Sequence, residues 1–205
     1  MTEEMTDKKK TMRIIGGKFR GRKIQDPHLK TTRPTKDRIR EAVFNMIAAE
    51  LPGARVLDLF AGSGAYGLEA LSRGAKEAVF AEKNPLCADT IKKNIQSLKL
   101  DDCAEVLSGD AFAAIISFGE KKEKFDLVFS DPPYAAGMTK KVLLMIYQYD
   151  ILNPTGLLIL EHTRSEGLPE LTRGVSVIKQ RTYGDISISI FMKRHGKKSG
   201  LSRDF

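Results

Sequence analysis

The most explicit chemistry in the sequence lies in the stretch Ser130–Tyr134, which reads Ser-Asp-Pro-Pro-Tyr. It follows an apolar run over residues 125–129 whose length and composition are typical of a buried strand. Proline cannot continue a sheet ladder, so the two prolines end that strand abruptly. We therefore predict a rigid loop that offers a carboxylate, a backbone carbonyl and an aromatic ring at the carboxyl end of a strand, where open α/β sheets bind their ligands. The same residues also suit an ordinary turn, so the rest of the chain must decide.

A second constellation is a glycine-rich turn that follows a predicted strand over residues 54–60. Gly62, Gly64 and Gly67 lead from that strand into a predicted helix over residues 65–73. Glycines at such a turn let the backbone approach a bound nucleotide closely. The spacing also satisfies the dinucleotide fingerprint, so a nicotinamide-type nucleotide remains an alternative here.

Two acidic residues follow the next two predicted strands. Glu82 lies about twenty residues after Gly62, where an acid suits the two hydroxyls of a ribose in either kind of nucleotide. Asp110 could accept a hydrogen bond from an adenine amino group, or could only cap the helix that starts at Ala111. Both roles for Asp110 stay open.

The elements that must position these residues alternate regularly along the chain. Repeated strand–helix units of this length predict a parallel sheet with helices on both faces. Residues 174–183 and 186–192 alternate polar and apolar side chains instead, which predicts an antiparallel hairpin at the edge of the sheet. The predicted strands of the repeating part cover 54–60, 76–82, 103–108, 125–130 and 156–161, and the helices between them cover 65–73, 84–98, 110–118 and 137–148.

The N-terminal part of the chain shows a different pattern. From Arg13 to Ile24 the sequence alternates around glycines, which predicts a short β-hairpin. Thr35 is placed to cap a following helix. We expect this helix to have one apolar face and three positively charged side chains exposed to solvent. The apolar face holds Ile39, Val43, Met46, Ile47 and Leu51, and the cations are Lys36, Arg38 and Arg40.

Length and composition indicate one domain with a small appendage. The chain has 205 residues, 41% of them hydrophobic, which is enough for a core. No apolar run reaches membrane-spanning length, the first residues do not resemble a signal peptide, and the two cysteines show no metal-binding or redox spacing. We therefore expect a cytoplasmic protein with no membrane association.

The net charge of +8 is concentrated at the two ends of the chain. Residues 13–40 carry ten lysines and arginines against two aspartates, and residues 193–205 carry five against one. A basic segment attached to a mildly acidic body suits a polyanionic partner. We divide the chain into a disordered N-terminus (1–12), a basic arm (13–34), a catalytic domain (35–193) and a basic tail (194–205).

The glycine turn, Glu82, Asp110 and the Ser-Asp-Pro-Pro-Tyr stretch resemble, in this order and spacing, the S-adenosylmethionine-dependent methyltransferases that modify exocyclic amino nitrogens. The Arg-Ile-Ile-Gly-Gly sequence from Arg13, the sequence over residues 32–44 (Thr-Arg-Pro-Thr-Lys-Asp-Arg-Ile-Arg-Glu-Ala-Val-Phe) and the Tyr-Gly-Asp turn at residues 183–185 are similar, more specifically, to the RsmD family. This resemblance covers nearly the whole chain, residues 13–193.

The resemblance implies an α/β fold of the Rossmann-like class I methyltransferase type. Its sheet would have seven strands, mostly parallel, with an antiparallel C-terminal hairpin, and a short N-terminal β-hairpin arm would precede it. The resemblance also implies that the enzyme methylates N2 of a guanine in bacterial 16S ribosomal RNA. The basic arm would then bind RNA, and the domain over residues 35–193 would be the methyltransferase.

The resemblance further implies a cofactor site at the ends of the first three strands. Asp58 and the Gly62–Gly64 loop would hold the methionine end of S-adenosylmethionine, Glu82 the ribose and Asp110 the adenine amine. Asp58 could also be a buried acid bonded to the backbone of the glycine turn, and both roles can hold together. The implied cofactor-binding set is Asp58, Phe60, Gly62, Gly64, Glu82, Lys83, Asp110 and Ala111, and no metal is implied.

The predicted catalytic set consists of Asp131, Pro132 and Tyr134. Guanine N2 is a poor nucleophile because its lone pair is delocalised into the ring. If the Asp131 carboxylate and the Pro132 carbonyl accept the two amino hydrogens, they hold the lone pair towards the methyl group and stabilise the positive charge that grows on nitrogen. Tyr134 would stack on the base. Whether Asp131 also takes the proton stays open.

The basic arm is the predicted RNA-binding segment, because its cations can meet phosphates. Phe19 could stack on a splayed base or could pack onto the domain. The predicted RNA-binding residues are Lys18, Arg20, Arg22, Arg33, Lys36, Arg38 and Arg40. The expected partner is ribosomal RNA in the small subunit or its assembly intermediate, and we expect the protein to be a monomer.

Three alternatives remain open. The Asp-Pro-Pro-Tyr motif is shared with methyltransferases that act on N6 of adenine, N4 of cytosine or protein glutamine, so the choice of guanine depends on the N-terminal segment. A nicotinamide-dependent oxidoreductase would leave Asp131 and Tyr134 unexplained, and none of the three histidines has an evident partner. A non-catalytic RNA-binding protein on the same fold conflicts with the intact Asp131 and Tyr134.

Overall fold

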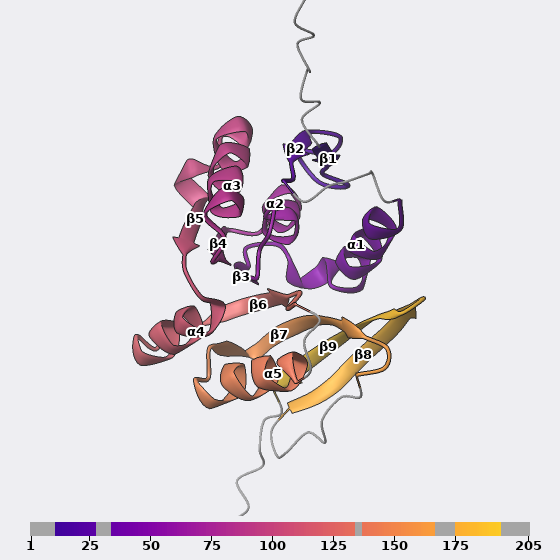
Figure 1. Ribbon diagram of the computed structural model, residues 1–205, viewed down its shortest axis with the longest axis vertical. Helices are drawn as coiled ribbons and strands as arrows, with labels where there is room; N and C mark the ends of the chain where they lie inside the picture. The colour runs from indigo at the N-terminus through magenta and orange to yellow at the C-terminus, as the bar shows by residue number, and fades with distance from the viewer. Residues whose placement is uncertain (1–10, 28–33, 134–136, 167–174, 194–205) are drawn as a thin grey trace, which may run out of the picture.

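The computed structural model describes residues 11–27, 34–133, 137–166 and 175–193. Within these residues the chain forms a seven-stranded sheet, five α-helices and a separate two-stranded sheet near the N-terminus (Figure 1). In the described part of the chain, every helix is too short or too polar to cross a membrane.

The seven-stranded sheet has the spatial order β5-β4-β3-β6-β7-β9-β8. The first five of these strands run parallel, whereas β9 pairs antiparallel with both β7 and β8. Within this sheet, the first strand along the chain is β3, in the middle. The chain then adds β4 and β5 on one side of β3 and crosses back to add β6 on the other side, so the strand order reverses between β3 and β6. Such a reversal leaves a crevice at the carboxyl ends of the two strands. The strands are β3 Arg55–Leu59, β4 Glu77–Glu82, β5 Ala104–Ser108, β6 Phe125–Ser130, β7 Leu152–Thr163, β8 Val175–Tyr183 and β9 Ile186–Lys193.

The helices cover both faces of this sheet and make two separate apolar cores (Figure 1). On one face, α1, α2 and α3 pack against side chains such as Phe129 and Ile159. On the other face, α4 and α5 pack against Val128 and Leu158. Neighbouring residues of β6 and β7 thus face opposite cores, as the two-residue period of a strand requires. The helices are α1 Pro34–Met46, α2 Ala65–Ser72, α3 Pro85–Leu98, α4 Ala111–Glu120 and α5 Met138–Gln148, with short 3-10 turns at Ala48–Glu50 and Asp101–Cys103.

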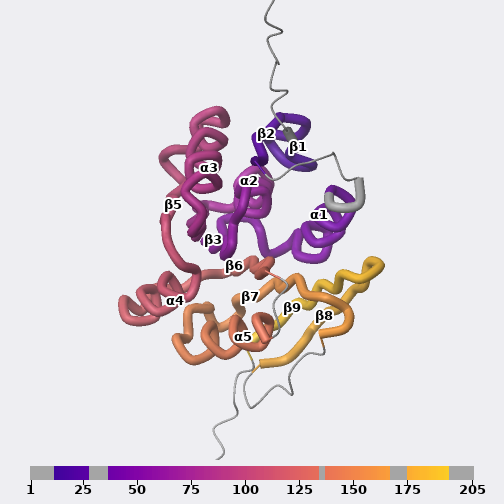
Figure 2. Tube along the Cα trace, in the orientation of Figure 1, coloured from indigo at the N-terminus to yellow at the C-terminus, as the bar shows by residue number. Residues whose placement is uncertain are grey.

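These elements confirm the predicted fold class: a mostly parallel seven-stranded sheet, an antiparallel C-terminal hairpin and an N-terminal β-hairpin. In Figure 2 the N-terminal strands β1 (Thr11–Arg13) and β2 (Lys23–Gln25) lie on the far side of the molecule from β8 and β9. The predicted hairpin is therefore present, and a nine-residue connection joins its strands, since Arg13 pairs with Lys23. The first strand begins at Thr11, within the last two residues of the segment that we expected to be disordered.

The N-terminal hairpin is attached to the end of α2 through a buried carboxylate. Glu69 is fully buried, and its two oxygens accept the backbone N–H groups of Ile15 and Gly16, each at 2.7 Å. The Nε atom of Arg73 lies 2.7 Å from the same carboxylate, and Nε of Arg40 lies at 3.9 Å. A buried charge needs such partners to offset its desolvation.

A second set of backbone contacts surrounds Ser72 at the end of α2. Its hydroxyl donates to the Gly16 carbonyl at 2.6 Å and accepts the Phe19 N–H at 2.9 Å, and its own carbonyl accepts the Lys18 N–H at 2.7 Å. Gly17 has a φ of +74°, and a Cβ there would overlap the Ser72 carbonyl. Only glycine fits this close approach. Ile14 adds apolar packing, since it belongs to the core under α1, α2 and α3.

Two expectations about α1 are wrong. The helix begins at Pro34, so Thr35 lies inside the first turn and does not cap it. Proline suits this first position because the N–H that it lacks would have no partner inside the helix. Arg40 is not in water but only 4% exposed, and its guanidinium donates to the Arg13 carbonyl at 2.8 Å and to Asp37 at 3.1 Å. The apolar face of the helix was predicted correctly for Val43, which is fully buried.

We predict that Glu69→Ala destabilises the protein by about 3–5 kcal/mol, because it leaves the Arg40 cation and two backbone N–H groups buried without the carboxylate. Urea denaturation followed by circular dichroism measures this change. Glu41→Ala is the matched control, since Glu41 lies exposed on α1 and should change the free energy of unfolding by less than about 0.5 kcal/mol. Equal stability of the two variants would contradict the role assigned to Glu69.

Candidate active site

The Ser-Asp-Pro-Pro-Tyr stretch lies where the sequence predicts it, at the carboxyl end of β6. Ser130 is the last strand residue and pairs with Leu59, the last residue of β3. Asp131 is half-buried, Pro132 is buried and Pro133 is exposed. The loop therefore lies where the strand order reverses, next to the glycine turn after β3, which is the position at which open α/β sheets bind their ligands. Tyr134 lies outside the described residues.

The glycine turn has an unusual backbone that the sequence did not predict in detail. Gly62 and Gly64 have φ values of +56° and +78°, and Phe60 also has a positive φ, +58°. This conformation is strained for a bulky residue, and such strain concentrates at ligand-binding loops. It places the Phe60 ring against Phe112 at 5.8 Å between centroids. Glycine is needed at position 67 for a different reason: a Cβ there would overlap the Phe80 ring.

Asp58 lies under this turn and is almost fully buried. Its carboxylate accepts the Gly67 N–H at 2.9 Å, which confirms the bond to the glycine turn that was one of its two predicted roles. Burial raises the pKa of Asp58 to about 8, and the nearby charges of Asp131 and Glu82 add to this effect. The three carboxylates thus share one site, and Asp58 carries a proton at neutral pH.

Glu82 ends β4 and holds the turn in place. One oxygen accepts the Gly62 N–H at 2.7 Å and the other accepts the Asn84 N–H at 2.8 Å. Each carboxylate oxygen has two lone pairs, so both can still accept a hydroxyl. Lys83, next in the chain, is exposed. A Cβ on Gly62 would meet no atom within 4 Å, so the space beside Glu82 is open.

Asp110 caps α4, as the simpler of its two predicted roles requires. Its Oδ1 atom accepts the N–H groups of Phe112 at 2.9 Å and Ala113 at 3.2 Å. The residue is exposed at the carboxyl end of β5, and a Cβ on the preceding Gly109 would meet no atom within 4 Å. Capping uses one oxygen, so it does not exclude an adenine contact. Ala111 is buried, and its side chain belongs to the core under α4.

The cations of the basic arm do not all share one role. Lys18, Arg20 and Arg22 are exposed in the connection between β1 and β2, and Arg22 also donates to the Ser97 carbonyl at 3.0 Å. Phe19 packs partly against the core, with the Lys18 ammonium 5.5 Å from the centre of its ring.

On α1 Arg38 is exposed, but the burial and ion pairs of Arg40 remove it from the predicted RNA-binding set. Its charge is already neutralised by the carboxylates of Asp37 and Glu69, which leaves it unable to reach a phosphate. Arg33 and the side chain of Lys36 lie outside the described residues.

Two polar residues that lie near this loop were not singled out from the sequence. Tyr66, in the first turn of α2, stacks on Phe129 at 5.2 Å between centroids, and its hydroxyl donates to Glu161 at 3.4 Å. Burial and the charges of Glu161 and Asp131 raise the pKa of Tyr66, so its hydroxyl keeps its proton. Glu161 lies near the end of β7. An acid at the end of a predicted strand was the available signal, the same signal that identified Glu82.

Asn94 on α3 is a third residue that the sequence did not reveal. It is 1% exposed, and it exchanges two hydrogen bonds with the backbone of Gln25 on β2, at 2.8 and 2.9 Å. Its amide also donates to the Ser63 carbonyl in the glycine turn at 3.2 Å. One side chain therefore joins the N-terminal hairpin to the turn beside Glu82.

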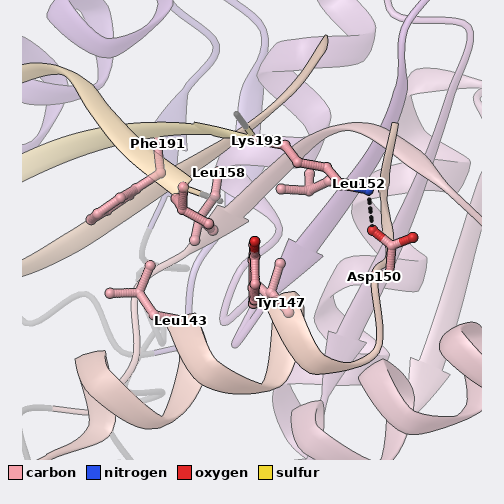
Figure 3. Close-up of a pocket in the computed structure, with 9 residues that line it drawn as sticks. Leu143, Tyr147, Asp150, Leu152, Leu158, Phe191 and Lys193 are labelled. Carbon is pink, nitrogen blue, oxygen red and sulfur yellow. Dashed lines mark hydrogen bonds and ion pairs between the residues drawn. The ribbon is translucent and has the colours of Figure 1, made fainter. Parts of the chain in front are cut away.

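Other features of the described chain lie away from this crevice. His162 is buried between β7 and β9, where its ring nitrogens meet the Thr163 carbonyl and the Ser189 hydroxyl, each at 2.9 Å, so it has a structural role. A surface hollow between α5 and strands β7 and β9 is lined mainly by apolar side chains (Figure 3). Its polar groups include Asp150, which pairs with Lys193, so this hollow offers no arrangement for catalysis.

Comparisons with known proteins agree with this geometry. The model of the family described as "Conserved hypothetical protein 95" matches residues 12–192. The chain is 34% identical to "Ribosomal RNA small subunit methyltransferase D" of Escherichia coli K12, over 89% of this chain and 90% of that protein. The protein of the same name from Haemophilus influenzae is 33% identical, over 88% of this chain and 93% of that protein.

Among solved structures, a hypothetical protein of Thermus thermophilus superposes with a TM-score of 0.75 at 30% identity, over 89% of this chain and 99% of that one. These matches span nearly the full length of each relative and confirm the predicted class I methyltransferase fold. The chain belongs to the Conserved hypothetical protein 95 family, whose members include the small-subunit ribosomal RNA methyltransferases D.

Proposed function

We propose that this protein transfers a methyl group from S-adenosylmethionine to the exocyclic N2 of a guanine in small-subunit ribosomal RNA. The observation that carries the proposal is the position of Asp131 and Pro132 at the end of β6, beside the glycine turn after β3. The similarity to small-subunit ribosomal RNA methyltransferases supports the choice of RNA. Such a substrate also implies a cytoplasmic location.

The residues around the glycine turn fit an adenosine cofactor. The open space at Gly62 and Gly109 allows a nucleoside to lie against the backbone. Glu82 would accept the ribose hydroxyls, and Oδ2 of Asp110, the oxygen that does not cap the helix, would accept the adenine amine. Asp58, with the turn at Gly62, would face the methionine end. When bound, S-adenosylmethionine supplies a methyl group that the sulfonium already activates.

Alignment of the amine is the main task of the protein in this reaction. In the proposal, the Asp131 carboxylate and the Pro132 carbonyl accept the two hydrogens of the guanine amine, which directs its lone pair into the crevice. The same two oxygens stabilise the positive charge that develops on nitrogen. The adjacent prolines fix the direction of the carbonyl without a backbone N–H. Tyr134 would stack on the extruded base.

The exposed cations between β1 and β2 would bind RNA phosphates. This segment is part of the fold, since Ile14 and Ile24 belong to a core of the main domain. Removing it would therefore disturb the cofactor turn as well as RNA binding, and substitution of single exposed side chains is the sharper test.

The test of the proposed function is methyl transfer from tritiated S-adenosylmethionine to small-subunit particles that lack this modification, followed by nucleoside analysis. We expect N2-methylguanosine as the product. Asp131→Ala should lower kcat by about 10²–10³-fold, because it removes one acceptor of the developing charge. Its affinity for S-adenosylhomocysteine should stay within about threefold of wild type.

Asp102→Ala is the control variant, since Asp102 is exposed in the turn before β5. This substitution should leave both kcat and the affinity for S-adenosylhomocysteine unchanged. A different methylated nucleoside would overturn the choice of guanine. Near-normal turnover of Asp131→Ala would overturn the role of Asp131.

The protonated state of Asp58 predicts a pH-dependent affinity for the cofactor. Its pKa of about 8 means that the free protein holds a proton there below that pH. A ligand ammonium near the carboxylate favours the ionised form, so affinity for S-adenosylhomocysteine should rise by up to about tenfold per pH unit between about pH 6 and 8. Calorimetry across this range measures it. In Asp58→Asn the rise that depends on this carboxyl should vanish, and an identical pH profile in both proteins would contradict the assignment.

The exposed arm cations predict a salt-dependent RNA affinity. In Lys18→Ala/Arg20→Ala, the slope of log affinity against log salt should fall by about 0.7 for each phosphate contact that is lost. Filter binding to small-subunit ribosomal RNA at several potassium chloride concentrations measures the slope. Lys121→Ala/Lys122→Ala is the matched control, because these exposed lysines follow α4, on the face of the sheet opposite α2 and the arm. Equal slopes for the two double variants would contradict an RNA-binding role for the arm.

A further inference from the structure

A second carboxylate lies beside the proposed amine-binding site, on the neighbouring strand. In the parallel pair β6–β7, Ser130 lies opposite Leu160, so Asp131 and Glu161 are the next residues of adjacent strands. Glu161 is 8% exposed. Neighbouring strands lie about 4.8 Å apart, so the two acids leave the sheet side by side.

The two acids also share one face of the sheet. Leu160 packs in the core under α4 and α5, whereas Ile159 packs on the opposite side with Phe129. Alternation along the strand puts Glu161 on the side of Ile159, and its hydrogen bond from Tyr66 confirms this side. The charges of Asp131 and Glu161 both raise the pKa of the Tyr66 hydroxyl, which places Asp131 near the same ring.

Tyr66 fixes the orientation of this second carboxylate. Its ring packs against both Phe44 and Phe129, at 6.1 and 5.2 Å between centroids, and those two rings also contact each other at 5.4 Å, which leaves the hydroxyl little freedom. The hydroxyl donates to one oxygen of Glu161. An ionised carboxylate has about four lone-pair sites, so Glu161 can accept a further hydrogen bond from a ligand.

The edges of the three bases that carry an amino group differ in the atom beside that group. Guanine presents N1–H, a donor, next to its N2 amine. Adenine presents N1 and cytosine presents N3, which are both acceptors, next to their amines. A carboxylate beside the amine-binding oxygens therefore attracts guanine and repels the other two bases, since two acceptors with no shared hydrogen are unfavourable.

We propose that Glu161 is the residue that selects guanine, by accepting the N1–H of the target base while Asp131 and Pro132 accept its amine. The inference rests on the proposed function, because it names the base-reading contact of the same site. It also supplies what the Asp-Pro-Pro-Tyr motif lacks, since that motif binds any exocyclic amine. Glu161 is a specificity-determining residue that touches the substrate, and Tyr66 is a positioning residue that acts through it.

The experiment compares Glu161→Gln with wild type on the same small-subunit particles, and measures kcat and KM. We expect kcat to fall by about 10²-fold, because a charged acceptor for N1–H is replaced by a neutral amide. KM should stay within about threefold, since phosphate contacts elsewhere dominate RNA affinity. Affinity for S-adenosylhomocysteine and the melting temperature should match wild type. Glu105→Gln, at an exposed position of β5, is the control for a glutamate-to-glutamine change.

The outcomes separate this inference from the proposed function. If wild type yields N2-methylguanosine and Glu161→Gln keeps more than half of its kcat, the base-reading role is wrong while the proposed function stands. If Glu161→Gln loses cofactor affinity or thermal stability together with activity, Glu161 has a structural role and the inference is also overturned. If wild type methylates another base, the proposed function itself fails.

Discussion

The buried carboxylate of Glu69 is the interaction on which the arrangement of the molecule depends. It joins three segments that are far apart in the sequence: the connection after β1 through two backbone N–H groups, α1 through Arg40, and its own helix through Arg73. A carboxylate with no exposed surface is stable only when all of these partners are present. One of the contacts that fix the basic segment over the domain is thus a charge in a place where neither water nor salt can screen it.

The same helix that carries Glu69 begins at the glycine turn. Glu69 and Ser72 hold the N-terminal hairpin near the end of α2, while Gly64 lies at its start, and the helix is only eight residues long. Asn94 makes a second link between Gln25 and the carbonyl of Ser63. The segment proposed to bind RNA and the turn proposed to bind the cofactor are therefore two ends of one rigid unit. Displacement of either end would be transmitted to the other through backbone hydrogen bonds.

Much of the fold could be predicted because its signals are local. The strands β3 to β6 end where glycine, an acid or proline follows an apolar run, so the sequence alone assigns residues such as Glu82 and Asp131 to the carboxyl edge of the sheet. Arg40 was misplaced because its pattern on α1 is that of a solvent-exposed face. The carboxylate that makes its burial possible comes from α2, and no local pattern reports a partner at that distance.

The same reason applies to Glu161 and Asn94, whose roles depend on which strand or helix becomes their neighbour. Glu161 lies beside Asp131 because the strand order places β7 next to β6. Asn94 bonds to Gln25, which lies 69 residues earlier in the sequence. The prediction that Thr35 caps α1 was wrong for a different reason. Pro34 and Thr35 are both residues that favour a helix start, and the helix begins at Pro34, whose fixed φ suits the first helical position.

Many of the contacts that attach the connection between β1 and β2 to the domain are made by its main chain. Backbone N–H and C=O groups of this connection bond to Glu69 and Ser72, while the exposed side chains of Lys18 and Arg20 take no part in the attachment. The shape of the loop is thus independent of the side chains at Lys18 and Arg20. Evolution or a protein engineer could rewrite the exposed positions to suit a different polymer, and the methyl-transfer machinery below would keep its geometry.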